Sequence, residues 1–145
     1  MITVVVSSYN RPRLICDALD SIFAQHEHDI GLLQVLVADD HSDAETLRVL
    51  ASYGDRIQVI QPPGDRPTMM ERQQGQRCAV VINAAMLHVC GKFVAFLPDD
   101  DVLLPGSLAC RARFLQEHPD AMVVYGRLEA CKCARNHPLG IPMEG

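Results

Sequence analysis

The sequence lacks the features that mark several common protein classes. No apolar run approaches the roughly 20 residues that span a bilayer, and no signal peptide precedes Ile2, so we expect a cytoplasmic protein. Acidic residues outnumber basic ones by 18 to 13, which argues against a nucleic-acid partner. No GxxxxGK[ST] motif occurs, which excludes a P-loop enzyme, and no GxGxxG follows a strand to support a dinucleotide-binding dehydrogenase.

Cysteine is present, but its spacing does not indicate a disulfide or zinc framework. Without an export signal the six cysteines are expected to be reduced thiols. Four of them fall in apolar periodic segments, where we expect them to act as small hydrophobic side chains. Cys131, Cys133 and His137 invite a zinc interpretation, but structural zinc needs four ligands and CxC is not a typical finger spacing. We therefore do not favour zinc.

What is present is an alternation of strands and helices over 145 residues, enough for one domain. Apolar runs predict strands at 2–6, 34–38, 56–61, 93–97 and 122–125, and helical spacing predicts helices near 12–23, 43–52, 71–90 and 105–118. After Gly126 the pattern fades, and from about residue 128 no further element is predicted. The expected fold is α/β and Rossmann-like. It is a mostly parallel sheet with helices on both faces and strand 2–6 between 34–38 and 93–97.

Three of the five predicted strands end in polar residues suited to binding. They are followed by the polar segments 7–11, 39–40 and 99–101. In open α/β sheets ligands bind beyond the carboxyl ends of the strands, so these segments predict one shared site.

The run Asp99, Asp100 and Asp101 is the most informative of these segments. Three adjacent carboxylates repel one another, and a hard divalent cation such as Mg²⁺ or Mn²⁺ relieves that repulsion. Mg²⁺ usually fills the rest of its shell with substrate phosphates, which indicates a diphosphate ligand. Taken alone, the run fits a solvated acidic turn or an Asp-rich helix start equally well.

Four motifs together resemble the donor-binding half of family 2 glycosyltransferases, an inverting group with the GT-A fold. VVVSSYNR at 4–11 is similar to that family's VVVPTYNR, and ADDHSD at 38–43 to its VDDGSxD. Asn83 and Gly91 occupy places of its NxGxxxAxGxY pattern, and FLPDDD at 96–101 corresponds to FLDxDD. The resemblance covers nearly the whole chain. It implies that residues 1–145 form a single domain for a UDP-sugar or dTDP-sugar donor with Mn²⁺ or Mg²⁺.

The resemblance also implies roles for individual residues. Asp39 is expected to accept a hydrogen bond from N3–H of uracil or thymine, which cytosine cannot donate. Asp99 and Asp100 are expected to flank ribose, diphosphate and metal, with Asp100 the foremost ligand and Asp101 a further candidate. The remaining nucleotide-binding candidates are Ser7 and Tyr9 near the base, and Arg11, Arg72 and Arg77 for the phosphates.

Some positions depart from the family pattern. Pro98 replaces the usual first aspartate of DxD, which shifts the expected metal site onto Asp99 and Asp100. Ala85 stands where glycine is usual, and Ile82 where arginine often precedes the asparagine.

Other classes fit the pattern less well. A receiver domain carries its acidic pair after the first strand and a later Lys-Pro, and a haloacid dehalogenase-type phosphatase carries DxD after the first strand. Neither arrangement occurs here. A nucleotide-sugar-binding module without catalysis, or a truncated fragment, stays open as an alternative.

The catalytic base of the family is not found in a recognisable motif. Inverting transfer needs a general base for the acceptor hydroxyl, and only Glu129 and Glu144 lie beyond Asp120. We therefore expect the acceptor-binding half to be missing from these 145 residues and to require a further domain. The acceptor, whether saccharide, lipid or protein, stays open.

Overall fold

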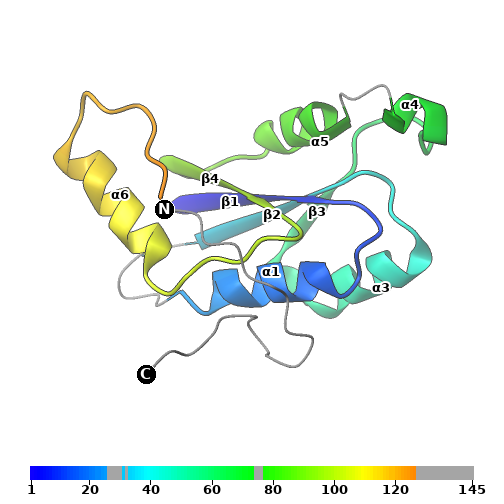
Figure 1. The fold of residues 1–145 in the computed structure, drawn as a ribbon, viewed down its shortest axis with the longest axis horizontal. Coiled ribbons are helices and arrows are strands. Elements are labelled where there is room, and N and C mark those ends of the chain that lie inside the picture. The colour runs from blue at the N-terminus through cyan, green and yellow to red at the C-terminus, as the bar shows by residue number, and fades with distance from the viewer. Residues whose placement is uncertain (26–30, 32, 74–76, 127–145) are drawn as a thin grey trace.

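The computed structural model describes residues 1–25, 31, 33–73 and 77–126, and these form one parallel sheet covered by helices (Figure 1). The strands are β1 (Ile2–Ser8), β2 (Leu33–Asp39), β3 (Gln58–Ile60) and β4 (Phe93–Pro98). Their order is β3-β2-β1-β4, and every pairing is parallel. The predicted place of the first strand, between the second and the fourth, is confirmed.

β1 is central because both of its faces carry apolar side chains. Val4 and Val6 pack into one core, which includes Ile15 and Leu19 of α1 (Leu14–Phe23), whereas Val5 faces a second core. Opposite faces alternate along a strand, so a continuous β-branched run is buried on both sides.

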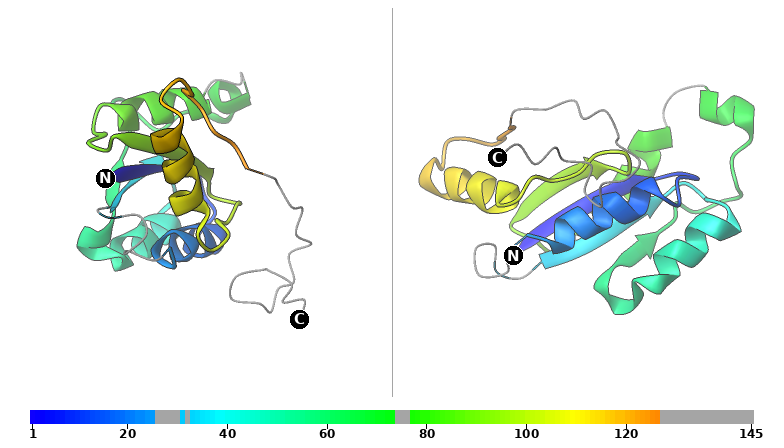
Figure 2. Two further views of the ribbon diagram at one scale, coloured as in Figure 1. Left: turned by 90° about the vertical axis from the view of Figure 1, so that its left-hand side faces the viewer. Right: turned by 60° about the horizontal axis from the view of Figure 1, so that its bottom comes forward.

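The helices form two layers on either side of the sheet. α1 and α3 (Ala44–Ser52) lie side by side on one face, whereas α5 (Arg77–Met86) covers the other (Figures 1 and 2). α6 (Ser107–Glu117) joins the first core through Leu108. The short α4 (Met69–Gln73) precedes α5, and a 3₁₀ turn (Gly54–Arg56) precedes β3. None of the helices within the described residues combines the length and apolar character that a bilayer span requires.

The predicted fifth strand is wrong. Residues 121–126 form no regular structure, and Met122, Val123 and Tyr125 are 93%, 78% and 90% exposed. An apolar run becomes a strand only when a neighbouring strand supplies backbone hydrogen bonds. The segment follows α6 without such a partner in the described part of the chain.

The single helix predicted for 71–90 is also wrong, because two helices occupy that stretch. α5 ends at Met86 rather than beside Gly91, and its last turn closes with bonds such as His88 N to Ala85 O, three residues back. Beyond this turn, the Gln34 side chain satisfies the backbone groups: its amide donates to His88 O and its oxygen accepts from Cys90 N–H.

The expectation for the cysteines is wrong at three of the four positions. Cys78, Cys90 and Cys110 are exposed, and Cys16 is half-buried. Each exposed cysteine lies on the solvent face of its segment, while Val81, Ala85 and Leu108 supply the buried stripes. The zinc candidates Cys131, Cys133 and His137 lie outside the described residues, as do Glu129 and Glu144.

Candidate functional site

The polar strand ends meet at the carboxyl edge of the sheet, as predicted. Ser8 and Asp39 are paired across β1 and β2, and the Asp99 N–H donates to Ser7 O from the other side of β1 at 3.1 Å. Asp39 and Asp99 therefore flank the end of β1, and their backbones lie about 10 Å apart, which is two strand spacings of ~4.8 Å. The prediction that these two carboxylates lie at the same edge of the sheet is confirmed.

A left-handed turn after β1 ties this strand to the loop after β2. Asn10 has φ of 50°, its N–H donates to Ser42 Oγ at 3.0 Å, and its Oδ1 accepts from Asp43 N–H at 2.7 Å. Asparagine tolerates this conformation better than most residues because of its short polar side chain. Asp43 in turn caps α3 by accepting from Thr46 N–H, a bond that lowers the Asp43 pKa. The two loops are thus held as one unit.

Asp99 and Asp100 converge on one guanidinium. Arg11 Nη1 lies 2.9 Å from Asp99 Oδ1 and 2.5 Å from Asp100 Oδ2. Burial raises the pKa of the Asp99 carboxyl, while the Tyr9 N–H at 3.1 Å and the Arg11 charge oppose that rise. Asp99 is 7% exposed at its side chain and Asp100 is 46% exposed. Asp99 is therefore buried and held by two hydrogen-bond donors, whereas the Asp100 side chain is exposed to solvent.

Asp101 lies apart from this convergence. It is exposed, and its N–H donates to Pro98 O at 3.2 Å, which closes the turn after β4. Within the described residues Arg11 pairs with Asp99 and Asp100 and not with Asp101.

Asp40 binds two arginines, Arg72 of α4 and Arg77 at the start of α5. Arg72 donates to Asp40 Oδ2 and, at 2.8 Å, to its backbone oxygen; Arg77 Nε donates to Asp40 Oδ1 at 3.0 Å. The hydrogen bond to Asp40 also raises the pKa of Arg77. The Arg72 guanidinium lies 3.7 Å from the centre of the Tyr9 ring, a cation–π contact. Asp40 therefore fastens α4 and the start of α5 to the sheet edge.

Asp39 is the most deeply buried carboxylate of the site. It is 0% exposed, and its Oδ2 accepts from Ser42 N–H at 3.0 Å and from Gln61 Nε2 at 2.8 Å. Its Oδ1 and the hydroxyl of Ser8 are buried without a hydrogen-bond partner among the described residues. Buried acceptors without a donor are costly, so these two atoms mark a place where a ligand can contribute.

Sequence reasoning brings most of these residues together, including Asp40 in the polar segment 39–40, but misses two. Ser42 enters only as part of a motif, and no role is predicted for Gln61. Gln61 directly follows β3, so the rule that polar strand ends form sites could have found it. The pairing of Asp40 with two arginines had no signal in the sequence.

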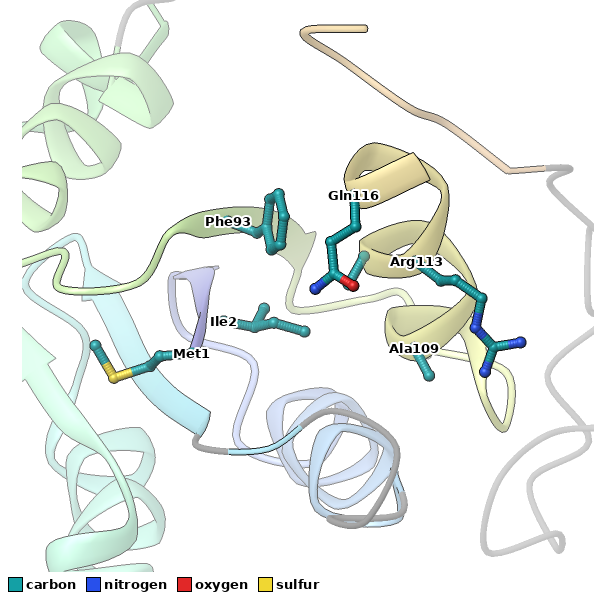
Figure 3. A pocket seen from close by; sticks show the side chains of 7 residues that line it. Met1, Ile2, Phe93, Ala109, Arg113 and Gln116 are labelled. Atoms are coloured by element: carbon teal, nitrogen blue, oxygen red, sulfur yellow. The ribbon is translucent and has the colours of Figure 1, made fainter. Parts of the chain in front are cut away.

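A small pocket of about 110 Å³ lies away from this edge (Figure 3). Ile2 and Phe93, the first residues of β1 and β4, line it together with Ala109, Arg113 and Gln116 around α6. It is therefore at the amino ends of the strands, remote from the carboxylates, and takes no part in the site.

The parallel sheet with helices on both faces and the polar carboxyl edge together define a Rossmann-like α/β domain. The profile of glycosyl transferase family 2 matches residues 3–141. The chain therefore belongs to glycosyl transferase family 2. Protein CgeD of Bacillus subtilis is 32% identical over 127 residues, which cover 87% of this chain and 29% of CgeD. Putative glycosyltransferase EpsE of the same species is 28% identical, over 85% of this chain and 41% of EpsE. The chain thus spans less than half of either relative.

Solved structures show the same architecture. TarS of Staphylococcus aureus is 26% identical with a TM-score of 0.64, covering 81% of this chain and 20% of TarS. Its residues 1–349 in complex with UDP-GlcNAc give a TM-score of 0.59 at 26% identity, over 81% of this chain and 32% of that one. The mannosyltransferase PcManGT of Pyrobaculum calidifontis, 23% identical with a TM-score of 0.60 over 79% of this chain and 32% of its own, shares the fold. The GT-A fold is confirmed.

Proposed function

We propose that this chain binds a UDP-sugar or dTDP-sugar donor at the carboxyl edge of its sheet. The observation that carries the proposal is Asp39: a buried carboxylate with one oxygen held by two N–H donors and the other without a donor. TarS, of similar fold, is solved with UDP-GlcNAc and with UDP. Family membership and this neighbour support a nucleotide sugar as the ligand.

The chemistry of Asp39 favours uracil or thymine over cytosine. A carboxylate only accepts hydrogen bonds, and N3 of uracil or thymine carries a hydrogen, whereas N3 of cytosine is itself an acceptor. Tyr9 and Ser7, on the neighbouring strand end, are proposed to line the base pocket. dTDP shares the N3–H and belongs to the same proposal.

The residues present fit a divalent cation. Asp99 Oδ1 and Asp100 Oδ2 already converge on one positively charged nitrogen, and carboxylate oxygens are the ligands that Mg²⁺ and Mn²⁺ prefer. We propose these two carboxylates as the metal ligands. Asp101, the further candidate from the sequence, lies apart from them, and no third carboxylate among the described residues joins this pair. A bound metal would neutralise the charge of the donor diphosphate. Arg11, beside both carboxylates, suits a phosphate because its guanidinium fork matches phosphate oxygens.

The roles of Arg72 and Arg77 stay predictions. Both guanidinium groups are paired with Asp40, so binding a phosphate would require them to share or exchange that partner. Transfer of the sugar with inversion, to a saccharide, lipid or protein acceptor, is part of the same proposal.

Calorimetric titration of UDP tests the donor and metal site. We expect tighter binding with Mn²⁺ than with EDTA. Asp100→Asn should remove most of that difference, roughly a tenfold or greater loss of affinity in Mn²⁺ because a contact to a charged group is lost. Asp120→Asn, an exposed aspartate outside the site, is the matched control and should bind as the unmodified chain does. Equal UDP affinity with and without metal would refute the metal role.

A further inference from the structure

Gln61 directly follows β3 and lies beside Asp39, the carboxylate proposed to bind the nucleobase. β3 pairs with β2 so that Ile60 lies opposite Ala38, and the next residues along the two strands are Gln61 and Asp39. Gln61 is an exposed residue at the sheet edge, yet its Nε2 donates to Asp39 Oδ2 at 2.8 Å. An otherwise free glutamine side chain is therefore held on a fully buried carboxylate.

The loop that carries Gln61 is fastened to the same turn a second time. His41 Nε2 lies 3.1 Å from Pro62 O, and His41 itself has φ of 53°, a left-handed conformation. This conformation is unfavourable for a residue with a Cβ, so contacts such as the one to Pro62 must compensate for it. The 39–42 turn is thus joined to Gln61 through Asp39 and to Pro62 through His41. The second hydrogen bond limits how far the Gln61 side-chain amide can move.

The two donors to Asp39 act on one oxygen only. Ser42 N–H and Gln61 Nε2 both meet Oδ2, so the plane of the carboxylate is fixed and Oδ1 is left as the single free acceptor. With Ser42 alone, one bond would hold the group, and rotation about Cβ–Cγ could exchange the two oxygens. A fixed acceptor distinguishes a base with an N–H at the facing position from a base with a lone pair there.

We infer that Gln61 is a positioning residue for nucleobase specificity: through its hydrogen bond to Oδ2 it orients Asp39 so that Oδ1 accepts from an imide N–H. The inference rests on the proposed donor site. It assigns the preference for uracil or thymine to a pair of residues, Asp39 and Gln61, rather than to the carboxylate alone.

Gln61→Met tests this, because methionine keeps the length of the side chain and removes the N–H donor. Gln58→Met is the matched control, as Gln58 is an exposed glutamine on β3, the strand that Gln61 directly follows. UDP, CDP and inorganic pyrophosphate are titrated with Mn²⁺ into the 145-residue chain and both variants. We expect Gln61→Met to bind UDP about tenfold more weakly. Its CDP and pyrophosphate affinities should be unchanged, so its preference for UDP over CDP falls, while Gln58→Met changes nothing.

The outcomes separate this inference from the proposed function. If the unmodified chain binds UDP no better than CDP, the proposed donor site is wrong. If it prefers UDP and Gln61→Met keeps that preference, or binds UDP more tightly, the positioning role is wrong while the donor site stands. Loss of pyrophosphate binding together with UDP binding would also overturn the role of Gln61, because the whole site and not base recognition would then be affected.

Discussion

Asp39 decides at the scale of one residue which base the proposed site accepts. Asparagine has nearly the same shape, and its oxygen can keep the bonds from Ser42 and Gln61. Its Nδ2 would then replace Oδ1, so a donor would face the base instead of an acceptor. Asp39→Asn should therefore lose at least tenfold in UDP affinity while CDP binding is retained or improved.

Calorimetry with UDP and CDP measures this change, and Asp55→Asn, an exposed aspartate in the 3₁₀ turn, serves as the control. If Asp39→Asn kept the original preference for UDP, the carboxylate would not be the group that reads the base.

Sequence alone predicts much of the site at this scale and misses a defined part. Asp39 ends β2, and Tyr9 and Asp99 directly follow β1 and β4, so the parallel sheet must bring them to one edge. The bond from Gln61 and the pairing of Asp40 with Arg72 and Arg77 depend on how a later loop and helix return to that edge. No local pattern encodes such an approach, which is why these contacts emerge only from the three-dimensional structure.

At the scale of elements, predictions hold where local and tertiary preferences agree. The runs of β1 and β2 contain several valines and are mostly buried inside the sheet, so strand propensity and packing coincide; the edge strand β4 pairs with β1 and buries Leu97. The run 122–125 has the same propensity without a neighbouring strand. Helical spacing across 71–90 could not reveal that α4 and α5 are separate elements.

Gly91 holds the turn between α5 and β4 against β1. A Cβ at this position would lie 2.6 Å from both Thr3 N and Thr3 Oγ1 and 2.9 Å from Phe93 O, mostly rigid backbone. Gly91→Ala should lower the free energy of unfolding by about 1–3 kcal/mol through overpacking. Urea denaturation measures it, with the exposed neighbour Cys90→Ala as control. An unchanged free energy of unfolding in Gly91→Ala would contradict this, because the turn could then move away from β1 without an energetic cost.

Asp40 joins α4 and α5 to the sheet. Its side chain is 6% exposed and those of Arg72 and Arg77 are 10% and 25% exposed, so removing the negative charge leaves two cations poorly compensated. Asp40→Asn should cost about 2–3 kcal/mol of stability and speed amide hydrogen exchange in α4. Asp65→Asn, exposed in the preceding loop, should do neither. Equal exchange rates in both variants would contradict the anchoring role.

At the scale of the whole molecule, donor binding and sugar transfer are separable. Asp39, Asp99 and Asp100 are proposed to serve nucleobase, diphosphate and metal, whereas Asp40 holds two arginines. No described residue is assigned as the general base for an acceptor. We predict that the 145-residue chain binds UDP-sugars but transfers sugar slowly. A turnover assay with UDP-sugars and a panel of saccharide, lipid and protein acceptors checks this. Slow release of sugar to water is compatible with the prediction, whereas rapid metal-dependent transfer would contradict it.

The most direct test of the proposed donor site is a crystal structure of this chain with UDP and Mn²⁺. We predict uracil N3 about 3 Å from Asp39 Oδ1, and Mn²⁺ bound by oxygens of Asp99 or Asp100 at about 2.2 Å and by the diphosphate. A base bound away from Asp39, or a metal that contacts neither carboxylate, would contradict the account of this edge as a nucleotide-sugar site.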